Sequence, residues 1–419
     1  MTSPIAAGVL WALTRLLLVG ASLKIGPFHK PGPLDYSVAT VYHGWDRVLA
    51  AGRFPLHDST WQYPPGAAGP LLAPHLLPFL DYDHAFVVCC ALTDALVTVL
   101  LLRAAGSAPD RSRAMAGCWM WVAGLPLLWT VPWNRFDLMV TALAVAGLLS
   151  AGSAAARARG DQRALGALVA LGLLVKVWPV LLLTGTARGR ATRTAWTAAA
   201  ATAALCGLLL WRTMPGSFGF LSAQGSRGIQ YEAVPALPFQ LARHLGWGGT
   251  LGVHDGSTEF LGPWVTAAAL ASEAATVLAG LWLLCWRLRA DRSAEHVLPD
   301  AALTAVLLFM VTSRVLSPQY LVWLVGLAAV CLVRPGSSQR PVAALIAAAC
   351  PLTLLVFPFL GHDIIQGSVL SGCVLAVRDL LLLAAAWLSA TRLWRSTRPG
   401  AAAGGAPPTA RLEPAAAEV

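Results

Sequence analysis

Charged residues at the ends of apolar stretches are the candidates for chemistry in this sequence. Four groups stand out: Asp35; Asn134, Arg135 and Asp137; Lys176; and Arg314. A charge within or beside a membrane span costs free energy, so such residues mark functional sites. Lysine and arginine converging on a carboxylate suit transfer from a lipid phosphate. The cations neutralise the departing phosphate, and the carboxylate deprotonates the attacking hydroxyl.

Each group also has a structural interpretation. Asp35 could act as the N-cap of a predicted helix, and its position alone favours that role. Arg135 and Asp137 could pair with each other as an anchor at the membrane interface. Lys176 and Arg314 could extend to lipid head groups, as long basic side chains near span ends do. The residues alone leave these alternatives open.

Apolar stretches must position these charges. Apolar residues make up 57% of the 419-residue chain and charged residues 12%, with a mean hydropathy of +0.64. Stretches of about twenty apolar residues suffice to cross a bilayer as a helix. They cover residues 5–23, 84–103, 113–131, 136–152, 164–187, 195–211, 262–286, 298–313, 318–333, 341–360 and 368–390. The sequence therefore predicts an all-α polytopic membrane protein, with the proline-rich stretch 67–80 as a re-entrant segment or short span.

Arginine clusters set the expected orientation. Six clusters lie near Arg103, Arg157, Arg188, Arg287, Arg334 and Arg392. Lysine and arginine gather in cytoplasmic loops, so all six clusters should face the cytoplasm. Only residues 164–187 separate the second cluster from the third, and a single crossing would place them on opposite sides. A hairpin broken between Lys176 and Pro179 removes this conflict, because Pro179 disrupts a helix. With this hairpin the chain makes about twelve crossings and both termini are cytoplasmic. The alternative is that residues 164–187 form one long span.

Two polar regions, residues 24–83 and 212–261, are expected on the external side. In the first, apolar residues from Val38 to Leu49 recur at helical spacing, which predicts an amphipathic surface helix ending at Gly52. The aromatic residues Trp61 and Tyr63 follow. The second region is rich in turn residues and should form a partly ordered cap over the first. We interpret residues 1–398 as one domain and 399–419 as a disordered cytoplasmic tail.

Composition also argues against several other classes of protein. The net charge of +10 is explained by arginines in membrane loops, so we expect no nucleic-acid partner. The eight cysteines lie within apolar stretches, without metal-ligand or disulfide spacing. The run Asp81-Tyr82-Asp83 imitates a metal-binding motif, but a loop or helix cap explains it better. We expect neither a metal nor a cofactor.

The order of several motifs resembles the polytopic glycosyltransferases of the GT-C class, most closely family 87, also called DUF2029. That family includes mannosyl- and arabinofuranosyltransferases. The matching motifs are Asp35 with Tyr42, Trp45 and Gly52; Tyr63-Pro64-Pro65; Arg135 with Asp137; Lys176 with Trp178 and Pro179; the run from Arg227 to Glu232; and Ser317 to Trp323. They span most of residues 1–335.

The resemblance implies transfer of a sugar, with inversion, from a polyprenyl-phosphate donor to a glycolipid or cell-envelope glycan at the outer face of the plasma membrane. It implies that Asp35 is the base, which overrides the cap interpretation. We assign the donor phosphate to Lys176 and Arg314. The expected substrate-binding residues are Trp61, Tyr63, Trp178, Arg135, Asp137, Arg227, Gln319 and Tyr320.

One motif departs from the family pattern. Mannosyltransferase members can carry a histidine pair after the Ser-Pro of the late motif, where this chain has Gln319, Tyr320 and Leu321. Mannose is the favoured sugar and arabinofuranose the alternative. A transporter of lipid-linked sugars or small solutes would also explain broken helices and charges within the membrane, although we see no internal repeat. A structural scaffold for an envelope complex would lack a pocket.

Overall fold

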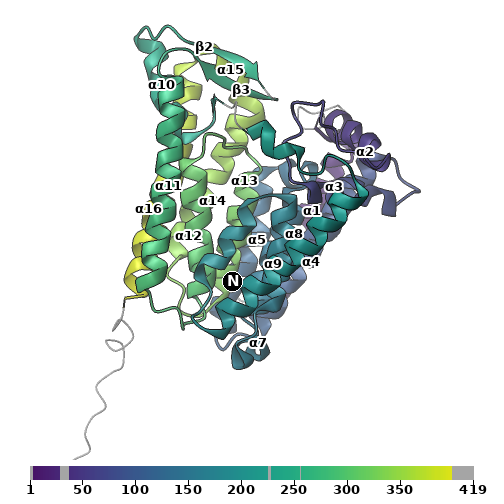
Figure 1. Cartoon of the computed structure of the whole chain (residues 1–419), viewed down its shortest axis with the longest axis vertical. Helices are drawn as coiled ribbons and strands as arrows, with labels where there is room; N and C mark the ends of the chain where they lie inside the picture. The colour runs from purple at the N-terminus through teal and green to yellow at the C-terminus, as the bar shows by residue number, and fades with distance from the viewer. Residues whose placement is uncertain (1–2, 29–36, 225–227, 255, 399–419) are drawn as a thin grey trace, which may run out of the picture.

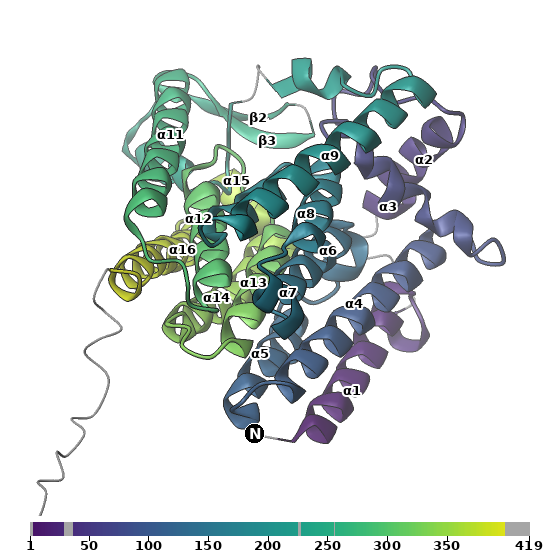
Figure 2. The same ribbon diagram turned by 60° about the horizontal axis from the view of Figure 1, so that its bottom comes forward.

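Most apolar stretches form helices that run side by side (Figures 1 and 2). The computed structural model describes residues 3–28, 37–224, 228–254 and 256–398. Asp35, Arg227 and the tail 399–419 lie outside these residues. The long helices are α1 (Pro4–Ser22), α4 (Tyr82–Gly106), α9 (Arg190–Thr213), α11 (Val265–Arg289), α14 (Arg340–Leu354) and α16 (Val369–Ser396). The shorter ones are α5 (Arg111–Gly124), α6 (Asp137–Ala151), α8 (Arg163–Val175), α12 (Val297–Thr312) and α13 (Tyr320–Val333).

The helices have the length and composition of membrane spans. Within the described ranges, six helical segments are long and apolar enough to cross a membrane, and four apolar helices are shorter. The chain is therefore a multi-pass membrane protein. An α-helix rises about 1.5 Å per residue, so several of the apolar stretches form helices that are shorter than a bilayer is thick. The expected total of about twelve crossings therefore stays a prediction.

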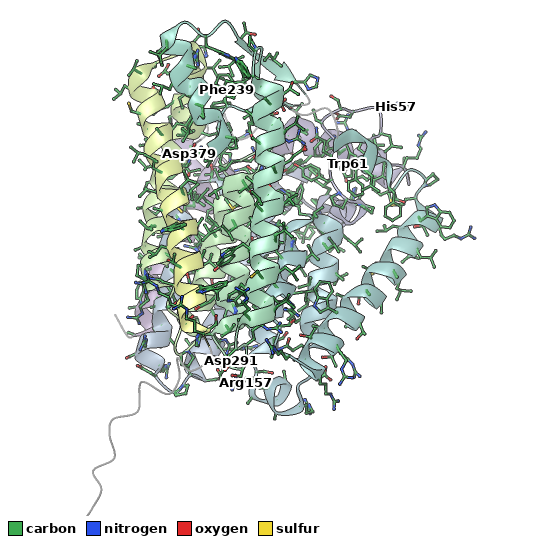
Figure 3. All side chains as sticks on the ribbon, turned by 60° about the vertical axis from the view of Figure 1, so that its left-hand side comes forward. His57, Trp61, Arg157, Phe239, Asp291 and Asp379 are labelled. Atoms are coloured by element: carbon green, nitrogen blue, oxygen red, sulfur yellow. The ribbon has the colours of Figure 1, made fainter. Side chains whose placement is uncertain are left out.

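One end of the helix bundle gathers arginines from several connections. The Arg157 guanidinium lies 2.8 Å from a carboxylate oxygen of Glu295. Arg188 donates a 2.6 Å hydrogen bond to the Leu288 carbonyl, and Arg334 donates a 3.2 Å bond to the Gly152 carbonyl. Figure 3 shows Arg157 and Asp291 at this end, far from Trp61 and Phe239. We call it the arginine-rich end.

The chain between α8 and α9 forms the broken hairpin that the arginine pattern predicts. The two helices begin side by side, because the Gln162 amide donates to the Thr194 hydroxyl at 3.0 Å. Helix α8 ends at Val175, the backbone of Lys176 after it is extended, and a 3-10 helix over Trp178–Gly185 follows. That segment returns to the arginine-rich end, where Arg292 donates to the Thr186 carbonyl at 2.7 Å. Both arginine clusters flanking the hairpin therefore lie at one end, and Lys176 lies near the tip.

The first polar region contains the expected amphipathic helix. A π-helical turn over Ser37–Tyr42 leads into α2 (His43–Ala50), and Val38, Tyr42, Trp45 and Leu49 are buried along one face. The chain leaves this helix through Gly52, whose positive φ of 74° suits glycine. Residues 65–76 form only short helical pieces, including α3 (Ala68–Leu72). They are shorter than the roughly twenty residues of a crossing helix, which favours the re-entrant segment over the short span for this stretch.

The second polar region contains strands that the all-α expectation missed. Strands β1 (Ile229–Gln230), β3 (Ser257–Leu261) and β2 (Thr250–His254) form an antiparallel sheet in that order. Short helices α10 (Leu237–Ala242) and α15 (Gly361–Gln366) lie near it in Figure 1. The region packs on the first as expected: Gly216 packs on Leu56, and Gly256 packs on Thr60. The strands are only two to five residues long, so they carry little periodicity.

Helix α13 is the buried centre of the bundle. Its residues from Leu321 to Ala329 are almost inaccessible. Gly326 allows close packing on Thr141 of α6, and Gly117 of α5 packs against the Ala329 carbonyl. Because α13 begins at Tyr320 and α6 at Asp137, their packing brings the two N-termini together. These helices and α8 position the candidate site.

Candidate functional site

A buried ion pair between Lys176 and Asp137 forms the centre of the candidate site. The Lys176 amino group lies 2.7 Å from Oδ1 of Asp137, and the two residues are 7% and 1% exposed. The indole Nε1 of Trp323 donates to the same oxygen at 2.8 Å. Oδ2 of Asp137 is buried and has no hydrogen-bond partner among the described residues. A buried carboxylate with an unused oxygen is costly unless another group binds there.

Aromatic rings surround the Lys176 amino group. The amino group lies 5.0 Å from the ring centroid of Phe136, 5.2 Å from Tyr63, and 5.4 Å from both Tyr320 and Trp323. Such distances allow cation–π attraction, which is stronger away from water. Trp323 also stacks on Tyr320 with centroids 4.0 Å apart and on Trp178 at 4.9 Å. The Lys176 amino group is therefore enclosed by a set of aromatic rings, which we call the aromatic wall: Tyr63, Phe136, Tyr320 and Trp323, with Trp178 stacked on Trp323.

Four separate segments supply these side chains. Asp137 is the first residue of α6, where the helix dipole favours a negative charge. Lys176 follows the last residue of α8, and Tyr320 and Trp323 lie one turn apart at the start of α13. Tyr63 precedes Gly66, which packs so closely on Leu174 that an added Cβ would lie 2.7 Å from the Leu174 carbonyl carbon. This contact fixes the Tyr63 segment against the end of α8.

The first polar region extends the aromatic wall. Trp61 is buried, with its ring centroid 5.2 Å from Trp45 and 5.9 Å from Tyr63. Trp45 Nε1 donates to Asp58 at 2.8 Å. Burial raises the pKa of Asp58, but hydrogen bonds from Thr60 and Trp45 outweigh it and leave the pKa below its usual value. Asp58 thus stays ionised and holds the aromatic residues in place.

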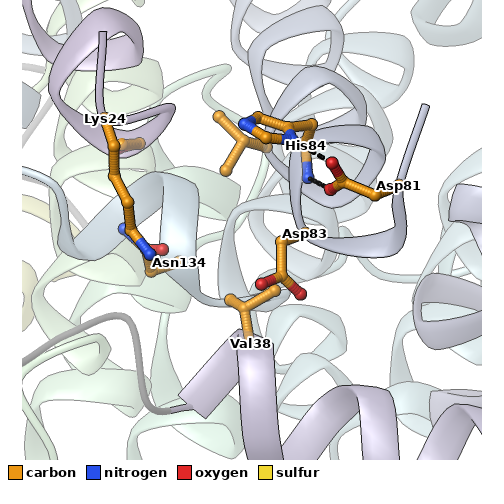
Figure 4. Close-up of a pocket in the computed structure, with 8 residues that line it drawn as sticks. Lys24, Val38, Asp81, Asp83, His84 and Asn134 are labelled. Atoms are coloured by element: carbon orange, nitrogen blue, oxygen red, sulfur yellow. Dashed lines mark hydrogen bonds and ion pairs between the residues drawn. The ribbon is translucent and has the colours of Figure 1, made fainter. Parts of the chain in front are cut away.

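A pocket of about 170 Å³ lies between the end of α1, the start of α4 and the segment before α6 (Figure 4). Its polar lining comprises Ser22, Lys24, Asp81, Asp83, His84 and Asn134. Asp81 caps α4 by accepting from the His84 amide at 2.9 Å, which agrees with the cap interpretation of this run. Oδ1 of Asp83 is buried without a hydrogen-bond partner in the described ranges. Asp35 precedes Val38, another lining residue, by only a few positions.

The structure brings some expected site residues together and separates others. Lys176, Asp137, Tyr63, Trp178 and Tyr320 converge, and Trp61 adjoins them through Tyr63. Their packing around one amino group could not be read from their spacing.

The remaining expected residues lie apart from this centre or are not placed. Arg135 does not pair with Asp137; its guanidinium donates to the Asn134 carbonyl at 2.8 Å. Arg314 pairs with the half-exposed Glu273 of α11 at 3.1 Å, whereas Lys176 pairs with Asp137. Gln319 is half-buried at the N-cap of α13. Asp35 and Arg227 lie outside the described residues.

Phe136 and Trp323 are the site residues that sequence reasoning missed. Trp323 lies three residues after Tyr320, a spacing that puts both on one helix face. Phe136 precedes Asp137 and shares its turn. Both residues lie in or beside the motifs named above, but their spacing does not distinguish a site residue from an ordinary core residue.

The model of glycosyltransferase family 87 matches residues 61–318, which is more than half of the chain. The chain belongs to glycosyltransferase family 87. The matched region includes Tyr63, Asp137, Lys176 and Trp178, and it ends just before Tyr320. A family 87 membrane glycosyltransferase is therefore favoured over a transporter or a scaffold.

Solved structures give a more distant comparison. The family 87 chain is similar to crystal structures of ArnT from Cupriavidus metallidurans in the apo state and bound to undecaprenyl phosphate. Identity is 14% in both cases, with 92% of this chain and 76% of ArnT covered, and the TM-scores are 0.49 and 0.48. Comparison with curated proteins finds no match.

Proposed function

We propose that this family 87 protein transfers a sugar, with mannose favoured, from a polyprenyl-phosphate donor to a glycolipid or cell-envelope glycan at the outer face of the membrane. The observation that carries the proposal is the buried Lys176 amino group beside Asp137 and beneath four aromatic rings. A phosphate and an adjoining sugar need this combination of positive charge and apolar ring faces.

The reaction requires one base and one cationic group. The acceptor hydroxyl oxygen attacks the anomeric carbon of the donor sugar, and the bond from that carbon to the phosphate oxygen breaks. The bonding electron pair leaves with the phosphate, whose added negative charge Lys176 neutralises. The acceptor proton passes to a carboxylate, which we assign to Asp35. Attack from the side opposite the phosphate inverts the anomeric configuration. No general acid is required, because the phosphate leaves as a stable anion.

Asp137 holds Lys176 in position in this proposal. An ammonium group has three hydrogen-bond donors, and Asp137 accepts one of them. The remaining donors can point to a phosphate oxygen. Trp323 donates to the same carboxylate oxygen and so fixes the Asp137 side chain. Asp137 therefore acts through Lys176 as a positioning residue.

The other assigned residues surround this centre. Tyr63 and Trp178, with Trp61 behind them, are proposed to line the sugar pocket. Arg314 remains a proposed phosphate ligand, and it would have to leave Glu273 to reach the phosphate. The further proposed substrate contacts are Arg135, Arg227, Gln319 and Tyr320.

The arrangement of helix ends supports an external site. Helices α6, α8 and α13 place Asp137, Lys176 and Tyr320 at the ends opposite the arginine-rich end. Lysine and arginine favour the cytoplasmic side, so the proposed site faces outward with the termini inside. We propose that residues 1–398 act as one domain and that a lipid-borne donor enters the site from the bilayer.

A direct assay tests the proposal. Purified protein would be incubated with labelled polyprenyl-phosphate mannose and, separately, with polyprenyl-phosphate arabinose, and glycosylated lipid products would be identified. We expect transfer from the mannose donor and its loss in Asp35→Asn at unchanged expression. Transfer only from the arabinose donor would correct the sugar, and an active Asp35→Asn variant would remove the base assignment. Transfer from neither donor, under several acceptors, would overturn the proposed function.

A further inference from the structure

A second pocket lies at the arginine-rich end, at the opposite ends of the helices from the Lys176 site. It has a volume of about 340 Å³ and lies where the start of α9 meets the end of α11. Three arginines line it, Arg188, Arg289 and Arg292, with Asp291 as the one lining carboxylate among the described residues. The catalytic proposal uses none of these residues.

Backbone carbonyls fix two of these arginines, Arg188 and Arg292, without neutralising them. Arg292 is 9% exposed and donates through Nη1 to the Thr186 carbonyl at 2.7 Å, while its buried Nε has no hydrogen-bond partner in the described ranges. Arg188 donates to the Leu288 carbonyl at 2.6 Å. Behind the pocket, Arg287 donates to the Thr186 hydroxyl at 3.1 Å. A further positive charge thus adjoins the three that line the pocket.

The charges are poorly compensated. Oδ1 of Asp291 already accepts the Ser293 amide at 3.0 Å, and the Asp291 side chain is exposed to solvent. Burial, together with the neighbouring Arg287 and Arg188, lowers the pKa of Arg292 to about 10. Like charges held close together repel, so a bound anion would stabilise this cluster.

An apolar strip on α11 leads to the pocket. Leu281, Leu284 and Leu288 recur at helical spacing, and each is more than half exposed. Leu288 adjoins Arg289, which is exposed and whose side chain makes no hydrogen bond or ion pair within the described part of the chain. A ligand with both acyl chains and a phosphate would match the strip and the arginines together.

We propose that this pocket binds a phosphate group, and that the phosphate belongs to an anionic membrane lipid whose acyl chains lie along α11. Arginine matches phosphate oxygens with paired N–H donors. The arginine-rich end is the one that the positive-inside rule assigns to the cytoplasmic leaflet, where basic pockets between helices bind anionic head groups.

Thermal unfolding of the full-length protein in neutral detergent tests this inference. The added probes are dioctanoyl phosphatidylglycerol, dioctanoyl phosphatidylcholine and inorganic phosphate. We expect phosphatidylglycerol to raise the Tm saturably and phosphatidylcholine to have no effect. Inorganic phosphate should act only at much higher concentration, because it cannot use the apolar strip. If it acts at the same concentration as phosphatidylglycerol, the lipid assignment is wrong.

Variants connect the effect to the pocket. The pocket variant combines Arg289→Gln with Arg188→Gln. Arg289 is chosen first because its side chain makes no hydrogen bond or ion pair within the described residues. Loss of two charge-assisted contacts should weaken phosphatidylglycerol binding by at least about tenfold. The matched control is Arg193→Gln with Arg340→Gln, which removes the same charge from exposed positions outside the pocket lining. Equal weakening in the control, or none in the pocket variant, would overturn the proposal.

Discussion

The amino group of Lys176 lies 2.7 Å from Oδ1 of Asp137, although the two residues are 39 positions apart in the chain. The pair joins the broken tip of the α8 hairpin to the first turn of α6. Both side chains are almost fully buried, so each is an unfavourable charge without the other. A single contact therefore links the stability of the bundle to the chemistry proposed for the end opposite the arginine-rich end.

Removing one partner of this pair should be far more damaging than removing both. We expect Asp137→Asn and Lys176→Met each to cost about 3–5 kcal/mol of stability, because each leaves a buried polar group without its partner. The double variant should recover part of that stability without recovering transfer. Thermal unfolding and sugar transfer, measured for all four proteins, complete the cycle.

The exposed ion pair of Arg314 provides the control for this cycle. Glu273→Gln should cost no more than about 1 kcal/mol, because the Glu273 side chain is 53% exposed.

Strictly additive effects of Asp137→Asn and Lys176→Met in the cycle would show that the two residues do not interact in the membrane.

The indole hydrogen bond of Trp323 should matter separately from its ring. Trp323→Phe keeps an aromatic ring beside Tyr320 and Trp178 but removes the donor to Asp137. Hydrogen bonds to charged groups contribute about 1.5–3 kcal/mol, so we expect lower stability and slower transfer. Trp178→Phe is the matched control, because Nε1 of Trp178 has no hydrogen-bond partner among the described residues. If the two variants behave alike, the hydrogen bond to Asp137 contributes nothing measurable.

The hairpin was predictable from charge, but the partner of Lys176 was not. Two arginine clusters separated by 164–187 require both ends of that stretch at one end of the bundle, and Pro179 identifies the break. Which charged residues pair with each other depends instead on the direction of their side chains. Arg135 has an extended backbone outside the helix, whereas Asp137 starts α6, so their closeness in sequence does not make them partners. Only the packing of α6 against α8 and α13 brings Lys176 to Asp137.

The close approach at Gly66 should be sensitive to one methyl group. In Gly66→Ala the added Cβ would lie 2.7 Å from the Leu174 carbonyl carbon, so the Tyr63 segment or the end of α8 must move. Overpacking of this kind costs about 1–3 kcal/mol, and displacement of Tyr63 from Lys176 should also reduce transfer. Gly69→Ala is the control, because nothing lies within 4 Å of its added Cβ. Normal activity in Gly66→Ala would mean that the Tyr63 segment is not fixed by this contact.

Glu232 should make stability depend on pH. Its side chain is 2% exposed, Oε2 lies 3.8 Å from Nη1 of Arg378, and burial raises its pKa from 4.5 to about 7. Below pH 4.5 the Glu232 carboxyl is protonated in both the folded and the unfolded state. As pH rises toward 7 the unfolded state loses the proton first, so the stability gained by burying a neutral carboxyl is progressively lost. The Tm should therefore fall by a few degrees between pH 5 and pH 8. Glu232→Gln should flatten that slope, whereas Asp363→Asn, an exposed carboxylate on α15, should leave it unchanged. An unaltered slope in Glu232→Gln would assign the pH dependence to other groups.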